Sequence, residues 1–177
     1  MLNPPARRRS FGFSLIELLV GIVIMVILAT LAMPSFQTML RNSEIRNAAE
    51  SIANGLQRAR AEAVARNANV EFVLGAGSSW TVDYAVKPVP TDPPIDSRLS
   101  GEGSRNASRT VLPAGATTIT FANLGVITAN ADASATLTQV DVAAAGGSQD
   151  LRVTIGPGGN AKMCDPALAP GSSPRAC

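Results

Sequence analysis

The chain has 177 residues, enough for one ordinary domain of about 100–150 residues plus an appendage, but not for two independent cores. It has no histidine, so the commonest general base is absent. Its two cysteines are too few for a four-cysteine zinc site. With 46% hydrophobic and 16% charged residues it is neither a disordered tail nor a fibrous repeat. No G-x-S-x-G, G-x-x-x-x-G-K or G-x-G-x-x-G motif is present. The composition therefore disfavours an enzyme, a metal site and a bound cofactor.

The first long apolar run covers residues 13–33 and reads FSLIELLVGIVIMVILATLAM, with Glu17 as its one charge. At about 1.5 Å per residue, a helix of this length crosses a hydrocarbon layer about 30 Å thick. Three arginines at positions 7–9 precede the run. Because basic residues stay on the cytoplasmic side of a membrane, the residues after Met33 are predicted to be exported.

An ordinary secretory signal peptide, cut after Ala32, is the competing interpretation of this run. Its apolar core is longer than the ~7–15 residues usual in a signal peptide. Glu17 has no purpose in an export tag, and a carboxylate costs about 2.5–3.5 kcal/mol at mid-membrane. The acid lies only four residues after Phe13, so it can lower that cost by reaching the headgroups. The residues around Glu17 therefore have to distinguish a cleaved signal peptide from a retained membrane segment.

Those residues read Gly12-Phe13-Ser14-Leu15-Ile16-Glu17-Leu18, and the apolar run that continues from them ends at Pro34. They resemble the type III signal of type IV pilins and type II secretion pseudopilins. The resemblance implies that residues 1–12 are a leader peptide. It also implies that a prepilin peptidase cuts between Gly12 and Phe13, methylates the new Phe13 amine, and leaves residues 13–33 as a transmembrane and filament-core helix.

The resemblance gives Glu17 a role in assembly. In this family, the acid at the fifth mature position is thought to pair with the N-terminal amine of a neighbouring subunit. An unpaired carboxylate in a dry helical bundle is expensive, whereas an ammonium partner offsets much of the desolvation. Pairing with the amine of its own subunit is the alternative for Glu17. A motif coincidence on an ordinary single-pass anchor is the alternative for the whole segment.

Residues 34–177 are predicted to form one periplasmic, pilin-like globular domain. Pro34 is predicted to kink the helix as it leaves the membrane, because proline lacks an N–H and crowds the preceding turn. Apolar residues then recur in steps of four and three, which place them on one stripe of a continuing helix that ends near Arg66. The stripe consists of Ile45, Ala49, Ile52, Leu56, Ala59 and Ala63. Off this stripe, Arg46–Glu50 and Arg58–Glu62 have the spacing of exposed ion pairs.

Strand-like runs rich in Val, Ile, Thr and aromatic residues follow at 70–74, 80–86, 117–122, 135–142 and 151–155. Gly-rich segments at 75–79 and 123–125 are predicted to be turns. The fold class is therefore α+β, with a long N-terminal helix packed on antiparallel β-sheet. Residues 87–113, with five prolines and few apolar residues, are predicted to be a long mobile surface loop. Its Arg98, Arg105 and Arg109 form either a solvated face or a contact for an acidic partner.

Cys164 and Cys177 are the only cysteines and lie in the predicted exported part. In an oxidising compartment a disulfide between them is the economical interpretation. Closing this loop is worth roughly 3 kcal/mol by the chain-entropy model, and the proline-rich tail has little else to order it. The alternative is that Cys177, as the last residue, stays a free thiol.

The strands, the Gly-rich turn and the Cys-closed tail resemble the FimT/GspH family of minor pilins and pseudopilins. Some FimT-type members bind DNA through a Gly-Arg-x-Arg segment before the first tail cysteine. Here that segment reads Gly159-Asn160-Ala161-Lys162, which keeps the glycine and one cation but replaces the first arginine. Lys162, helped by Asn160, Arg152 and Arg175, is therefore predicted to bind double-stranded DNA weakly and without sequence preference, unless Lys162 is merely an exposed strand-end residue.

The sequence therefore predicts a minor pilin of a type IV pilus that contributes to DNA binding and uptake. A type II secretion pseudopilin is the second interpretation, and a membrane-anchored periplasmic protein that is not a pilin is the third. The predicted partners are other pilins or pseudopilins, the prepilin peptidase, the inner membrane and DNA. Without residues 1–12 the chain has twelve basic and thirteen acidic residues, so DNA binding would need a local basic patch.

Overall fold

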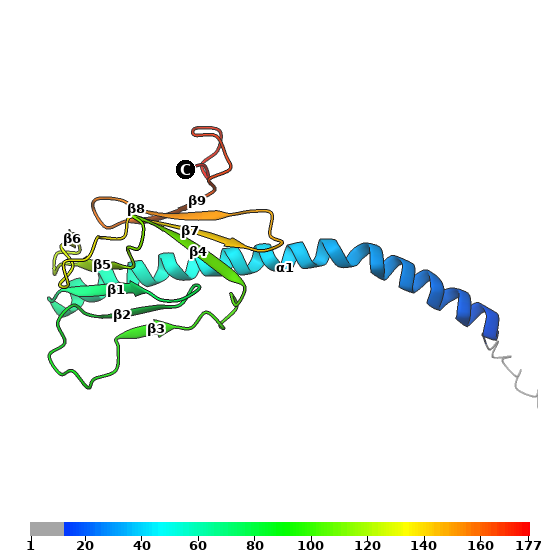
Figure 1. Cartoon of the computed structure of the whole chain (residues 1–177), viewed down its shortest axis with the longest axis horizontal. Helices are drawn as coiled ribbons and strands as arrows, with labels where there is room; N and C mark the ends of the chain where they lie inside the picture. The colour runs from blue at the N-terminus through cyan, green and yellow to red at the C-terminus, as the bar shows by residue number, and fades with distance from the viewer. Residues whose placement is uncertain (1–12) are drawn as a thin grey trace, which may run out of the picture. The chain divides into compact units, whose positions relative to one another are not determined.

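The computed structural model describes residues 13–177, and the predicted leader, including Gly12, lies outside the described residues. The described residues divide into two compact units, one that ends at Phe36 and one from Gln37 to Cys177. Helix α1 (Leu15–Arg66) supplies residues to both units and is continuous through Pro34 (Figure 1). The predicted long helix is confirmed. The kink expected at Pro34 remains a prediction.

Both ends of α1 have a local cause. The Glu17 N–H donates to Ser14 Oγ at 3.3 Å, so Ser14 caps the first turn, and Ser-x-x-Glu is the pattern of a capping box. At the other end, Asn67 adopts a left-handed conformation with φ of 49°. The Ala68 N–H then donates to the carbonyl of Ala63 at 3.2 Å, which satisfies an acceptor in the last turn.

The predicted stripe on α1 is the helix's contribution to the core. All six of its residues are completely buried. The two predicted ion pairs form, with Arg46–Glu50 at 3.3 Å and Arg58–Glu62 at 2.9 Å. The first is exposed as predicted, but the Glu62 side chain of the second is largely buried. Neighbours of the stripe such as Ala48 and Gly55 are buried as well, so more than one side of the helix is covered.

One sheet, sheet A, has the strand order β3-β2-β1-β5-β6, with antiparallel neighbours throughout. The β1–β2 turn closes with Gly75 N–H donating to Ser79 O at 2.8 Å. The β5–β6 turn uses Gly125 at φ of 72°, a conformation that favours glycine. Both predicted turns are therefore confirmed. The strands are β1 (Val70–Leu74), β2 (Trp80–Tyr84), β3 (Asp96–Arg98), β5 (Thr118–Phe121) and β6 (Ile127–Thr128).

The other sheet, sheet B, has the order β4-β7-β8-β9 and is also antiparallel. Figure 1 shows β2 and β3 of sheet A on one side of the C-terminal half of α1 and β7, β8 and β9 of sheet B on the other. Buried residues of the helix and of both sheets form one hydrophobic cluster, all of it after Phe36. Residues 37–177 therefore hold a complete core of their own. The strands are β4 (Ala107–Leu112), β7 (Gln139–Ala144), β8 (Leu151–Ile155) and β9 (Ala161–Cys164).

The prediction of a loop without regular structure at 87–113 is wrong, because this segment contains β3 and β4. Strand β4 alternates between inward and outward residues, with Ala107 and Val111 on the inner side. The sequence of β4 does not show the alternation of apolar and polar residues that predicts a strand. Arg109 takes an inward position, and Leu112, which is half exposed, takes an outward one. Strands β6 and β9 were also not expected, since both are too short to show a period.

A carboxylate on sheet A opposes folding at neutral pH. Glu71 on β1 lies directly opposite Asp83 on β2. Burial raises the pKa of Glu71, and the negative charges of Asp132 and Asp83 raise it further. An acid whose pKa is raised by folding binds protons more tightly in the folded state, so its contribution to stability falls as pH rises above its ordinary value of about 4.5.

The change Glu71→Gln is expected to stabilise the domain at pH 7 and to have little effect near pH 4, where the native carboxyl is protonated. Because the side chain is partly exposed, solvent screening limits the gain to a few tenths up to about 1 kcal/mol. Urea unfolding of residues 37–177 at both pH values measures it. The exposed, paired Glu50→Gln is the control, and an equal gain at both pH values would contradict this assignment.

Candidate functional site

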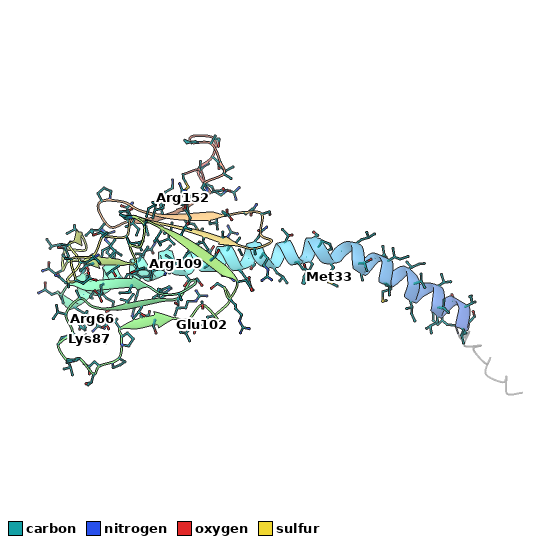
Figure 2. All side chains as sticks on the ribbon, in the orientation of Figure 1. Met33, Arg66, Lys87, Glu102, Arg109 and Arg152 are labelled. Atoms are coloured by element: carbon teal, nitrogen blue, oxygen red, sulfur yellow. A yellow bond between two sulfur atoms is a disulfide. The ribbon has the colours of Figure 1, made fainter. Side chains whose placement is uncertain are left out.

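The first unit consists of the apolar part of α1. Within the described residues, α1 is the one helix long and apolar enough to cross a membrane. Its large side chains are exposed, from Leu15 at 81% to Met33 at 55% (Figure 2). Phe13 is 84% exposed and precedes the helix. This surface has the composition of a segment that needs lipid or other helices around it.

Glu17 lies in the first turn of this apolar segment. Within residues 13–177, no ion pair or hydrogen bond to its carboxylate is formed, although its backbone N–H is held by Ser14. A carboxylate at the helix N-terminus is favoured by the helix dipole, but that interaction satisfies only part of its charge. The group therefore has capacity for a cation from outside the described residues.

The predicted DNA-binding residues do not form one basic patch. Arg152 and Lys162 share the outer face of β8 and β9, because Thr154 pairs with Lys162 and residues two apart share a face. Arg152 is already paired with Asp141, through Nε–Oδ1 at 2.6 Å and Nη2–Oδ2 at 3.0 Å (Figure 2). The hydrogen bond to Asp141 raises the pKa of Arg152. This bidentate pair occupies the donors that would contact a phosphate.

Asn160 and Gly159 lie in the turn between β8 and β9. The Asn160 carbonyl accepts from the Gly156 N–H at 2.9 Å, and its side chain is exposed. Gly159 has a φ of 77°, and a Cβ there would lie 2.8 Å from Phe121 Cε1 and 3.2 Å from Gly125 O. Gly159, the glycine of the segment that resembles the Gly-Arg-x-Arg motif, is therefore required by the fold.

The C-terminal tail is held against β9. Cys164 and Cys177 form a disulfide with a Cα–Cα distance of 5.1 Å. The Asp165 N–H donates to Arg175 O at 2.7 Å, and Lys162 Nζ donates to Ala176 O at 3.5 Å. The disulfide prediction is confirmed. Lys162 therefore contacts the tail backbone while its side chain stays largely exposed.

Arg109 has a structural role that was not predicted from the sequence. Its Nε donates to the carbonyl of Gly75 at 2.8 Å and its Nη2 to the carbonyl of Leu74 at 3.3 Å (Figure 2). Burial lowers the pKa of this guanidinium. The side chain thus joins β4 of sheet B to the β1–β2 turn of sheet A. No local signal distinguishes it from the neighbouring arginines at positions 98 and 105.

Metal-binding side chains do not gather anywhere in the described part of the chain: no three His, Cys, Asp or Glu residues are placed to hold an ion. The features with a defined arrangement are the exposed apolar helix with Glu17 and the disulfide-closed end of sheet B. A long helix, apolar in its first part and packed between two antiparallel sheets in its second, defines a type IV pilin-like protein.

Two family profiles match the chain. The "Prokaryotic N-terminal methylation motif" matches residues 7–33, and "Type II transport protein GspH" matches residues 48–159, more than half of the chain. The chain belongs to the GspH family of pilin-like proteins. This is a family of structural pilin and pseudopilin subunits, not of enzymes. The third interpretation, of an anchored protein that is not a pilin, is thereby set aside.

A solved structure has the same class of fold. The type IV minor pilin FimU of Pseudomonas aeruginosa strain PAO1 superposes with a TM-score of 0.52 at 17% identity, over 70% of this chain and 93% of that one. A second crystal form of FimU gives 0.47 at 17% identity, over 69% and 97%. At this identity the likeness concerns the fold alone. A comparison with curated protein sequences finds no significant match.

Proposed function

We propose that the chain is a minor pilin of a type IV pilus, assembled through its N-terminal helix. Residues 13–33 would hold it in the inner membrane as a single-pass protein, with residues 34–177 in the periplasm until it enters a cell-surface filament. The observation that carries the proposal is the coincidence of the methylation-motif match at 7–33 with an apolar helix whose large side chains are exposed. The role is structural, without catalysis or a cofactor.

Processing by a prepilin peptidase is part of this proposal. The cut falls between Gly12, which lies outside the described residues, and Phe13, which becomes N-methylated. Because α1 begins only at Leu15 and is capped by Ser14, Phe13 lies before the helix. Phe13, the described residue at the cut, therefore lies outside the helix, as a protease substrate requires.

Glu17 is the assembly residue in this proposal. Its carboxylate has no cation within the described residues, while processing creates an ammonium group four residues upstream. In a filament the apolar helices pack together and exclude water, so each Glu17 gains most from the N-terminal ammonium of a neighbouring subunit. The pairing would favour one axial register of adjacent subunits.

A pseudopilin of a type II secretion system is the second candidate, because the profile that matches residues 48–159 is described as a type II transport protein. Deleting the gene in its native host separates the two. A minor pilin predicts at least tenfold fewer surface pili by electron microscopy with secretion of exoproteins unchanged, and the gene in trans restores the pili. Normal piliation with lost secretion would identify a pseudopilin instead.

A weak DNA contact at Lys162, with Arg175 nearby in the tail, is the remaining part of the proposed function. Arg152 is committed to Asp141, so two cations remain, and the log of the binding constant should fall with the log of salt with a slope of about −2. Fluorescence anisotropy of residues 37–177 with a labelled duplex should show several-fold weaker binding for Lys162→Ala. Arg105→Ala, an exposed arginine elsewhere, is the control, and no binding at low salt would contradict the contact.

A further inference from the structure

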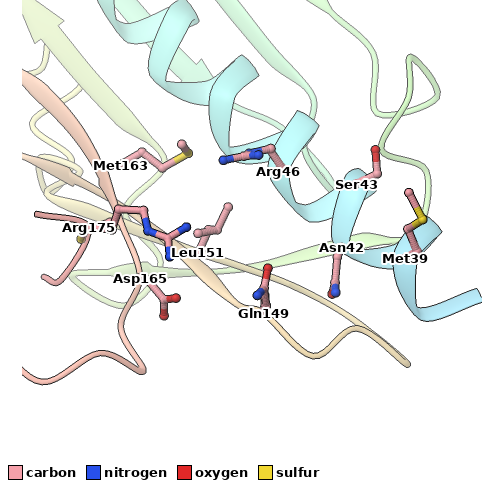
Figure 3. A pocket seen from close by; sticks show the side chains of 10 residues that line it. Met39, Asn42, Ser43, Arg46, Gln149, Leu151, Met163, Asp165 and Arg175 are labelled. Atoms are coloured by element: carbon pink, nitrogen blue, oxygen red, sulfur yellow. The ribbon is translucent and has the colours of Figure 1, made fainter. Parts of the chain in front are cut away.

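A cavity of about 300 Å³ lies in the globular unit, where sheet B meets α1 and the tail. One wall is the segment of α1 from Met39 to Arg46, the floor is formed by Leu151 of β8 and Met163 of β9, and the other wall is the disulfide-closed tail with Arg175 (Figure 3). None of these residues has a role in the proposed function except Arg175.

Two guanidinium groups approach this cavity from opposite walls. Figure 3 shows the side chain of Arg46 extending from α1 towards Met163, and that of Arg175 extending from the tail towards Leu151. Within residues 13–177, the Arg175 guanidinium forms no ion pair or hydrogen bond; only its backbone is bonded. Two cations that face a shared space repel one another, so an anion between them is favourable.

The negative charges near the cavity do not satisfy these cations. Asp165 accepts the Ala167 N–H at 2.9 Å, and in Figure 3 its carboxylate points away from Arg175. Arg46 pairs with Glu50 at 3.3 Å through Nε, but both side chains are at least half exposed. Such a surface pair is weak and leaves the other nitrogens of Arg46 available. The other polar lining residues, Asn42, Ser43 and Gln149, are uncharged.

The position of Arg175 is fixed before any ligand arrives. Its carbonyl accepts from the Asp165 N–H at 2.7 Å, its N–H donates to Ser173 Oγ at 3.2 Å, and the disulfide closes at Cys177 two residues later. A fixed backbone lowers the entropy lost when a side chain binds. The bonded tail backbone thus presents Arg175 at the cavity.

The floor between the two arginines is apolar. Leu151 and Met163 are partly buried against the core, and Met39 at the rim is 70% exposed. An apolar floor with two guanidinium groups above it matches a carboxylate that has an apolar neighbour, because guanidinium binds carboxylate in a bidentate manner. A bare phosphate would leave the floor uncovered.

We propose that this cavity binds an acidic peptide segment of a partner protein, with an aspartate or glutamate carboxylate between Arg46 and Arg175 and an apolar side chain on Leu151 and Met163. If the chain is a filament subunit, as proposed above, a neighbouring subunit supplies the segment. Peptide binding at this site does not require filament assembly, so the binding experiment tests the site separately from the proposed role as a minor pilin.

The test uses the full chain in detergent micelles and a fluorescein-labelled peptide, Ala-Leu-Glu-Leu-Ala, in an anisotropy titration. The same peptide with Gln in place of Glu is expected to bind at least tenfold more weakly. Arg46→Ala and Arg175→Ala should each weaken binding of the Glu peptide at least fivefold, and Arg66→Ala, at the other end of this part of α1, should leave it unchanged. All three arginines are exposed, so these variants should fold.

Three results would overturn the proposal. Equal binding of the Glu and Gln peptides would show that the carboxylate is not recognised. Binding unaffected by both Arg46→Ala and Arg175→Ala would place the peptide elsewhere. Binding of a labelled DNA duplex that Arg46→Ala and Arg175→Ala weaken, with no binding of the Glu peptide, would identify a phosphate site instead.

Discussion

Replacing Glu17 with glutamine is expected to leave cleavage after Gly12 intact and to lower the amount of the protein in sheared filaments at least tenfold. Glutamine keeps the shape of the side chain and removes its charge. The neighbouring subunit's ammonium would then be left unpaired among apolar helices, and breaking a buried ion pair in this way costs about 3–5 kcal/mol. Since about 1.4 kcal/mol is a tenfold change in an equilibrium constant, the loss of incorporation should be nearly complete.

Two control variants separate the charge from the helix. Glu17→Asp keeps the carboxylate and should restore part of the incorporation. Ser14→Ala removes the cap of α1, which typically costs about 1 kcal/mol, but leaves the charge in place. Immunoblots of membrane and filament fractions measure all three variants. Normal incorporation of Glu17→Gln would show that the pairing is not needed for assembly.

The substitution Gly55→Val is expected to lower the free energy of unfolding of the globular domain by about 3 kcal/mol, the upper end of the usual cost of overpacking. A Cβ at this position would lie 2.7 Å from Phe72 Cε2 and 2.9 Å from two atoms of the Trp80 ring. Neither ring can move freely, because Phe72 is completely buried and Trp80 Nε1 donates to Ser51 Oγ at 2.8 Å. Any gain in helix propensity over glycine is much smaller.

Asn54→Val is the matched control, because it places the same side chain one position earlier on α1, where the surface is exposed. It should change the unfolding free energy by a few tenths of a kcal/mol. Urea unfolding followed by far-UV circular dichroism and by the fluorescence of Trp80, the one tryptophan, measures both variants. Equal stability of Gly55→Val and the native chain would mean that α1 and sheet A are not packed as described.

Features set by local sequence were predictable. The stripe from Ile45 to Ala63 has the helical period over several turns, and every member is buried. Strands β1 and β8 agree with their predicted bounds because each is a short run rich in β-branched residues between turns. The apolar helix and Glu17 were recognisable for the same reason, since all of their evidence lies within one segment.

Features set by pairing between distant segments were not predictable. Strand β4 depends on β7 for its hydrogen bonds, and the inward Arg109 is accommodated only because Leu74 and Gly75 bring their carbonyls to it. Likewise, nothing in the sequence shows that Arg152 has a partner, but the pairing of β7 with β8 places Asp141 beside it. The cavity between Arg46 and Arg175 joins residues far apart in the chain, so no motif could indicate it.

Intact-mass and N-terminal analysis of the protein purified from its native membrane is the most direct test of the processing that assembly requires. The expected chain begins at N-methylated Phe13, and its Cys164–Cys177 disulfide is formed. A chain that begins at Met33, as after cleavage by a signal peptidase, or one that keeps residues 1–12 would contradict the account.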